Sequence, residues 1–329
     1  ISERFRRLPF KKDNDNTNAE AGSNIYFGGV DVSFPEEAST KEGEDEQLEP
    51  PPSVAVYVIL EYPSGNIVYQ DHEYFTLQVP YIPSYLAFRE IDPLERLIKK
   101  QMQEKPNLTP RAILVDGNGI LHPRKAGIAC FVGVRTGIPA IGVGKTLYYE
   151  GELNKDTVLH QMEQSLSEVV SSLQNKDDGQ EPEQKIMLDR ECIVLDNQHI
   201  PQKSHSTEDR HEKVPLDRGK LVSDLSRYCS GFAVPLAANE KGGDILAYAL
   251  LGHGGRIRGS KTRKASSSSS SSVQTGTKNP IYVSVGHNIS LQEAVRICAA
   301  FSFAKIPEPV RQADLIGREL QRVKTNNRT

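Results

Sequence analysis

The chain has 329 residues, of which 37% are hydrophobic, 25% charged and 7% aromatic, with no Trp. Its net charge of -3 at pH 7 excludes a uniformly basic coat for nucleic acid, but not a local basic groove. The longest apolar run, from Val54 to Leu60, falls well short of the roughly 18 residues needed to cross a bilayer. We therefore expect no membrane partner. The apolar fraction is low for this length, so we expect part of the chain to lie outside the folded core.

The four cysteines, at 130, 192, 229 and 298, form no Cys-x-x-Cys pair. This spacing argues against a disulfide framework or a structural zinc site and favours a reducing compartment. No secretory signal is recognised at the start of the sequence, which begins at Ile1. We expect a location in the cytoplasm and nucleus, including the nucleolus. Since no helix presents a sustained heptad seam, we expect a monomer.

Taken in chain order, residues 1–24 are polar and predict a flexible arm. Stretches rich in charge, Pro or Ser predict insertions at 35–52, 173–215 and 259–279. Apolar runs bounded by turns predict strands at 25–34, 54–60, 67–78, 111–115, 140–143, 187–195, 245–251 and 281–285. Helical spacing predicts helices at 84–102, 125–135, 290–303 and 309–323. This order indicates a mixed α/β sheet in a single domain over 25–323, followed by a polar tail at 324–329.

Three carboxylates lie where apolar surroundings are predicted. Asp31 lies inside an apolar strand, Asp116 closes another, and Glu90 begins a helix. A buried carboxylate is costly unless it is paired or bound to a metal. Hard cations such as Mg²⁺ prefer oxygen ligands and typically share their site with a substrate phosphate. The alternative is three separate salt bridges to Arg or Lys, and the spacing alone leaves both interpretations open.

The segment 116–125 follows a predicted strand and opens a predicted helix. Its glycines let a ligand approach the backbone, and a helix N-terminus favours an anion. Arg124 and Lys125 could add contacts to phosphate. An ordinary strand-to-helix turn is the alternative, and the residues alone do not decide between them.

Two other segments have both a functional and a plain interpretation. The run 142–146 resembles a phosphate-binding loop, but the position that must be Gly is Pro139, so we reject that motif. Lys145 remains a candidate for a phosphate or water contact, or is a solvated lysine. The segment Pro80–Pro83 is stiff, and a rigid apolar wedge of this kind can enter a base stack. Alternatively, Tyr81 packs on the core.

Blocks of sequence along the chain resemble the endonuclease V family of RNase H-like nucleases, which cut nucleic acids next to deaminated adenine. The blocks are GVDVSF at 29–34, PYIPSYLAFRE at 80–90, DGNGILHPRKAGIA at 116–129, IGVGK at 141–145, and GHNISL with IPEPVRQAD at 286–314. The long inserts resemble those of a eukaryotic member. The resemblance implies an RNase H-like mixed five-stranded sheet flanked by helices, with polar insertions.

The resemblance also implies roles for individual residues. Asp31, Glu90 and Asp116 match the family's metal-binding carboxylates, and Asp314 matches a fourth metal position that is Asp or His in different members. Lys145 matches a family lysine near the scissile region and completes the implied catalytic set. The implied substrate-binding residues are Pro80, Tyr81, Ile82, Pro83, Ser84, Leu86, Gly117, His122, Arg124, Lys125, Ile128 and Gly142.

Within that set, the PYIP block matches the family's wedge, with Tyr81 beside the damaged base. Gly117, His122 and Ile128 match the pocket that receives the flipped hypoxanthine. Ser84 departs from the family pattern, because members often have Gly after PYIP. A pocket that Ser84 lines would therefore differ in shape.

The implied activity is Mg²⁺-dependent cleavage at the second phosphodiester 3′ of inosine, leaving 3′-hydroxyl and 5′-phosphate ends, with Mn²⁺ able to substitute. Eukaryotic members are associated with inosine in single-stranded RNA, which is therefore the first expected substrate. Repair of deoxyinosine-containing DNA is the alternative. A non-cleaving binder of inosine RNA is an alternative of another class, and a metal-dependent phosphatase would leave PYIP unexplained.

Overall fold

The computed structural model describes residues 24–35, 52–62, 64–77, 82–148, 153–159, 162, 192–194, 231–237, 244–252, 279–302 and 304–326. Residues 1–23 of the predicted arm, most of the three predicted insertions and half of the polar tail lie outside these residues. The chain divides into two compact units. The first comprises residues 1–144, 284–294 and 308–329, and the second comprises 145–283 and 295–307. The single catalytic domain over 25–323 stays a prediction.

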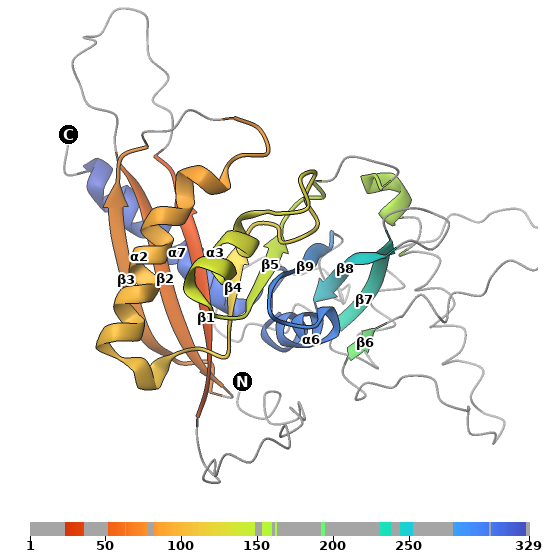
Figure 1. Cartoon of the computed structure of the whole chain (residues 1–329), viewed down its shortest axis with the longest axis horizontal. Helices are drawn as coiled ribbons and strands as arrows, with labels where there is room; N and C mark the ends of the chain where they lie inside the picture. The colour runs from red at the N-terminus through yellow and green to blue at the C-terminus, as the bar shows by residue number, and fades with distance from the viewer. Residues whose placement is uncertain are drawn as a thin grey trace, which may run out of the picture. The chain divides into compact units, whose positions relative to one another are not determined.

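The first unit is built around a set of five strands. They are β1 (Ile25–Ser33), β2 (Ser53–Tyr62), β3 (Ile67–Phe75), β4 (Ala112–Asp116) and β5 (Ala140–Gly144). Their order is β3-β2-β1-β4-β5 (Figure 1). β2 runs antiparallel to β1 and β3, whereas β4 runs parallel to β1 and β5. The mixed α/β sheet predicted from the sequence is confirmed.

Helices cover both faces of these strands. α2 (Ala87–Glu104) and α3 (Ile128–Thr136) lie on one face, and α7 (Glu308–Asn326) lies on the other (Figure 1). Ile91 and Leu94 of α2 pack in one apolar core with Val30 of β1. On the opposite face, a Cβ added at Gly29 would lie 2.2 Å from the backbone of Pro309, so α7 rests directly on β1.

Both helices of the first face begin later than predicted. α2 begins at Ala87 instead of residue 84, and α3 begins at Ile128 instead of residue 125. Ser84 has a φ of 65° and Lys125 has a φ of 55°. A residue in this left-handed region cannot form part of a right-handed helix, so each segment folds as a turn that precedes its helix.

The remaining elements are η1 (Pro106–Leu108), β6 (Cys192–Val194), β7 (Gly231–Ala237), β8 (Ile245–Gly252), β9 (Ile281–His287) and α6 (Leu291–Phe301). β6 pairs in parallel with β7, and β7 pairs antiparallel with β8. β6 lies within the predicted strand at 187–195, and β8 and β9 overlap the predicted pair at 245–251 and 281–285. β7 was not predicted. None of the helices in the described part of the chain is long and apolar enough to cross a membrane.

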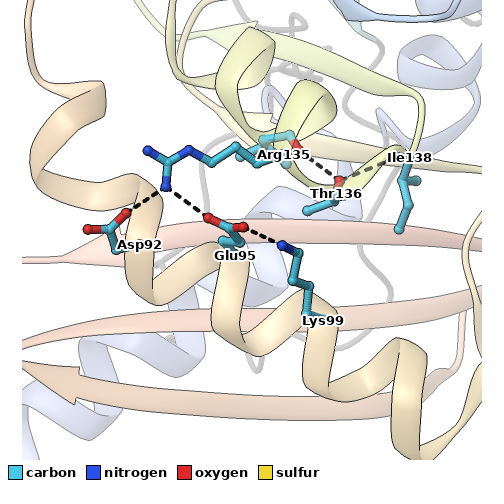
Figure 2. A network of polar contacts seen from close by, with 7 residues as sticks. Asp92, Glu95, Lys99, Arg135, Thr136 and Ile138 are labelled. Atoms are coloured by element: carbon cyan, nitrogen blue, oxygen red, sulfur yellow. Dashed lines mark hydrogen bonds and ion pairs between the residues drawn. The ribbon is translucent and has the colours of Figure 1, made fainter.

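An ion-pair network joins α2 to α3 at the surface (Figure 2). Arg135 Nη1 lies 2.7 Å from Asp92 Oδ1 and 2.8 Å from Glu95 Oε2, while Lys99 pairs with the same Glu95. Because exposed ion pairs each contribute about 0–1 kcal/mol, this network adds little to the free energy of unfolding. Arg135 is therefore a suitable control position for arginine variants elsewhere.

Candidate active site

Two of the predicted carboxylates lie where the pairing of two neighbouring parallel strands ends. The pairing of β1 with β4 ends at Val30 opposite Val115, and the next residues are Asp31 and Asp116. Adjacent strands are about 4.8 Å apart, so the two residues are neighbours at the carboxyl end of the strand pair. Asp31 is only 7% exposed, and Ser33 Oγ donates to its Oδ2 at 3.4 Å. Ligands of α/β sheets characteristically bind at this end of parallel strands.

The fourth predicted carboxylate lies on α7. This helix contacts β1 at Gly29 and again at Ser33, on either side of Asp31 in the strand. Asp314 lies on the stretch of α7 between these two contacts, and its Oδ1 is 2.8 Å from Arg318 Nη2. Asp314 is therefore carried on the helix that runs past Asp31.

Glu90 lies in the first turn of α2 and is 6% exposed. Burial and, to a lesser extent, the nearby negative charge of Asp116 raise the pKa of its carboxyl, and Arg89 acts in the opposite direction; the net result is a pKa of about 8. The side chains of Glu90 and Asp116 are thus close enough to interact electrostatically. A buried carboxyl with so high a pKa is one that the surrounding protein does not neutralise when it ionises.

The chemistry of this donor set fits a hard divalent cation. Its side chains offer only carboxylate oxygens, and a cation would compensate the ionised form of Glu90. Within the described residues, however, no three His, Cys, Asp or Glu side chains converge closely enough to form a metal cluster. The structure therefore places Glu90 near Asp116, and it places Asp31 on the strand adjacent to that of Asp116. The three side chains do not converge on one point.

A glycine-rich loop, residues 117–127, connects β4 to α3. Gly117 has a φ of 137°, a conformation that favours glycine. The N–H of Gly119 donates to Ser284 Oγ at 2.9 Å, and the N–H of Ile120 donates to the carbonyl of Val285 at 2.8 Å. The backbone of the glycine-rich loop is consequently fixed against β9 directly beside Asp116.

The loop also packs on β5 so closely that Gly142→Ala should displace it. A Cβ at this position would lie 2.2 Å from the backbone N of Gly119. We expect this variant to lose about 1–3 kcal/mol of unfolding free energy in urea titrations, and the loop amides to exchange faster with solvent.

Gly137→Ala is the matched control for this prediction. Gly137 ends α3 with a φ of 74°, and nothing lies within 4 Å of an added Cβ. We expect a loss of about 1 kcal/mol from the left-handed backbone alone, with unchanged exchange in the glycine-rich loop. Equal exchange rates in the two variants would contradict the packing argument.

The turn before α2, residues 82–86, is joined to the glycine-rich loop by one side chain. Arg124 Nε donates to Ser84 Oγ at 3.0 Å, and Arg124 Cζ lies 3.9 Å from the ring centroid of Tyr85. On the loop side, the N–H of Arg124 donates to Nδ1 of the buried His122 at 3.2 Å. Arg124, predicted to contact phosphate, is thus engaged with two protein side chains.

The other predicted substrate-binding residues are placed as follows. Pro80 and Tyr81 lie outside the described residues, while Ile82, Pro83 and Leu86 are exposed. Ile128 opens α3, with its side chain against Gly117. Lys125 lies in the glycine-rich loop. Lys145 directly follows β5 and belongs to the second unit, so it is not counted among the residues brought together here. The roles of all these residues stay predictions.

Three residues of this region were not singled out from the sequence. Ser284 fixes the glycine-rich loop, Tyr85 stacks under Arg124, and Asn118 has a buried Oδ1 with no hydrogen-bond partner within the described residues. The position of Asn118 between two glycines was an available signal. Nothing local marks Ser284, because its partner Gly119 is distant in sequence.

Comparisons with known proteins agree over most of the chain. A family model described as Endonuclease V matches residues 10–182 and 258–315. Endonuclease V of Mus musculus is 32% identical over 89% of this chain, and that of Homo sapiens is 29% identical over 89%. The matched region spans 58% of the mouse protein and 70% of the human protein.

Solved structures give the same result for the fold. Human endonuclease V superposes with a TM-score of 0.56 at 27% identity, covering 92% of this chain and 86% of the human chain. Endonuclease V of Ciona intestinalis, in complex with a 24mer DNA containing an inosine followed by a ribo-adenosine, gives a TM-score of 0.53 at 26% identity. That match covers 91% of this chain and 87% of the Ciona chain. The similarity thus extends to sequence, fold and the region of the acidic residues.

Proposed function

The chain belongs to the endonuclease V family, and from this premise we propose that it is a metal-dependent endonuclease that cuts nucleic acid next to inosine. One observation carries the proposal beyond family membership. Asp31 and Asp116 directly follow the last residue pair between the parallel strands β1 and β4, and the buried Glu90 lies close enough to Asp116 for that charge to raise its pKa. These neighbouring positions support a shared site for the three acidic residues, which come from separate elements of the first unit.

Inosine-containing single-stranded RNA is the substrate we propose first, with cleavage at the second phosphodiester on the 3′ side and 3′-hydroxyl and 5′-phosphate products. The Ciona relative was crystallised with DNA in which a ribo-adenosine follows the inosine. That ligand places a ribose within the bound strand and so supports RNA without excluding DNA. Deoxyinosine-containing DNA is the alternative substrate.

In this proposal, Asp31, Glu90, Asp116 and Asp314 would hold one or two Mg²⁺ ions. When bound, Mg²⁺ supplies activation of water and neutralisation of charge on the departing oxygen. Lys145 would offset charge on the phosphate. Asp314 would need to exchange its bond with Arg318 for a metal contact, which an exposed pair permits at small cost.

The glycine-rich loop would receive the extruded base. Hypoxanthine has a carbonyl acceptor where adenine has an amino donor, so a fixed N–H donor in the pocket would accept one base and reject the other. A site built around such a pair can discriminate by up to about 10⁴–10⁵-fold. The fixed backbone of this loop, held by Ser284 and Val285, suits this task because it cannot turn to accommodate adenine.

Cleavage of matched, end-labelled oligonucleotides tests the proposal. Single-stranded RNA and DNA, each carrying one inosine or one adenosine, are incubated with Mg²⁺ or with a chelator. We expect a single metal-dependent cut in inosine RNA and none in adenosine RNA. An Asp31→Asn variant purified in the same way controls for contaminating nucleases.

The other outcomes of this assay are equally informative. A cut that favours inosine DNA would make DNA the substrate and retain the enzyme. Tight inosine-dependent binding without a cut would indicate a binding protein in place of an enzyme. The absence of both binding and cleavage would refute the proposal.

A further inference from the structure

We propose that Arg124 is a positioning residue that fastens the turn at residues 82–86, which includes Ile82 and Pro83 of the predicted wedge, to the glycine-rich loop that forms the predicted base pocket. The inference rests on the proposed function. It concerns how an inosine is extracted from a stack, and it assigns Arg124 a role other than the phosphate contact expected from the sequence.

Arg124 is held on both sides. Its guanidinium donates to Ser84 Oγ at 3.0 Å and stacks over Tyr85 at 3.9 Å, whereas its own N–H donates to His122 Nδ1 at 3.2 Å. A planar guanidinium can donate in its plane and stack on a ring with its face at the same time, which a lysine ammonium cannot do. The geometry therefore uses the features that distinguish Arg from Lys.

The conformation of Ser84 also points to a purpose for this bond. Its φ of 65° lies in the left-handed region, which a non-glycine residue adopts only when its surroundings hold it there. A glycine would adopt this conformation more readily, but it has no hydroxyl for Arg124 to bind. Ser84 thus adopts a less favourable backbone conformation than Gly would, but its hydroxyl accepts the hydrogen bond that connects the turn to the loop.

A row of aromatic rings also links this turn to α3. The centroid of Tyr85 lies 5.9 Å from that of Phe88, and Phe88 lies 5.1 Å from Phe131 of α3. Since the glycine-rich loop leads directly into α3, the turn contacts this continuous segment at two places, Arg124 and Phe131. The turn and loop are then expected to move together.

This arrangement predicts which substrates depend on Arg124. A wedge must be rigidly placed relative to the pocket when it opens a base pair, because unstacking costs several kcal/mol per step. An inosine in a single strand needs far less help. Loss of the tie should therefore impair cleavage of paired inosine much more than cleavage of unpaired inosine.

The test uses full-length protein with Arg124→Lys, Ser84→Ala and the double variant, and Arg135→Lys as the arginine control on α3. Single-turnover cleavage is measured with inosine in a single strand and in a duplex. We expect about a 10-fold loss on duplex for each single variant, a loss of about 2-fold or less on the single strand, and no further loss in the double variant. Arg135→Lys should change neither rate.

A second readout follows base extrusion without cleavage. With Ca²⁺ in place of Mg²⁺, the fluorescence of a 2-aminopurine beside the inosine should rise on binding of the wild-type protein to duplex. We expect Arg124→Lys and Ser84→Ala each to reduce this rise. A variant that is only less stable would still give the full rise in fluorescence when enough folded protein is present to saturate the duplex.

Several results would overturn the inference. Equal losses on both substrates for Arg124→Lys, with no effect of Ser84→Ala, would return Arg124 to a phosphate contact. Additive losses in the double variant would show that the two residues act separately. If the wild-type protein neither cuts nor binds inosine, the proposed function fails. If the wild-type protein is active but the variants lose the same fraction of their rate on duplex and on single strand, only the role of Arg124 is refuted.

Discussion

Asp116→Asn is expected to lower cleavage of every inosine substrate by at least about 100-fold while leaving inosine binding in place. The substitution preserves the size of the side chain and its position at the end of β4 but removes the charge. Because the charge of Asp116 raises the pKa of Glu90, the variant should also lower that pKa. Single-turnover rates measure the loss of cleavage, and a binding titration in chelator measures whether inosine binding is retained.

Asp71→Asn is the matched control. Asp71 lies on β3, where its carboxylate pairs with Lys100 Nζ at 2.8 Å. It does not belong to the predicted catalytic or substrate-binding residues. We expect unchanged cleavage in this variant. Full cleavage by Asp116→Asn in Mg²⁺ would remove Asp116 from the catalytic set and with it the central observation of the proposed function.

Glu90→Gln is expected to make the metal-free protein more stable at neutral and alkaline pH. The pKa of Glu90 is raised from its ordinary 4.5 to about 8 in the folded chain, chiefly by burial. Between these two values the folded state binds more protons than the unfolded state, so unfolding free energy falls as the pH rises, by up to about 1.4 kcal/mol per pH unit. Gln cannot ionise, so this fall should disappear.

Urea unfolding from pH 5 to pH 9 in chelator measures this difference. Glu95→Gln, five residues along the same helix, is a control of opposite sign. Hydrogen bonds from Lys99 and Arg135 lower the pKa of Glu95, so its charged form stabilises the fold above its unfolded pKa. We expect Glu95→Gln to be slightly less stable than the wild type at pH 7. Parallel curves for wild type and Glu90→Gln would contradict the burial of an uncompensated carboxyl.

Sequence patterns located the candidate carboxylates because burial and charge rarely coincide. Asp31 within an apolar strand and Asp116 at the end of another were visible as exceptions to a local rule. The resemblance added Asp314, which no local pattern distinguishes on a helix rich in charge. Its position relative to β1 depends on contacts between residues about 280 positions apart, such as Gly29 and Pro309, which periodicity does not encode.

The errors in the secondary structure have local physical causes. Both helix starts were placed too early because left-handed residues other than glycine, at Ser84 and Lys125, leave no mark in the sequence. β7 was missed because Gly231 and Pro235 both weaken a strand pattern. The tie between Arg124 and Ser84 could not be predicted at all, since it joins two turns through side chains.

The docking of α7 on β1 has a consequence for the synthesis of the protein. Pro309, which rests on Gly29, is translated 280 residues after it. At 5–20 residues per second, about 14–56 seconds separate the two events. Until then one face of β1 has no covering helix and Asp314 has not been made. A nascent chain therefore cannot assemble the complete acidic set before Asp314 has been made, and any activity that depends on this set would be acquired only then.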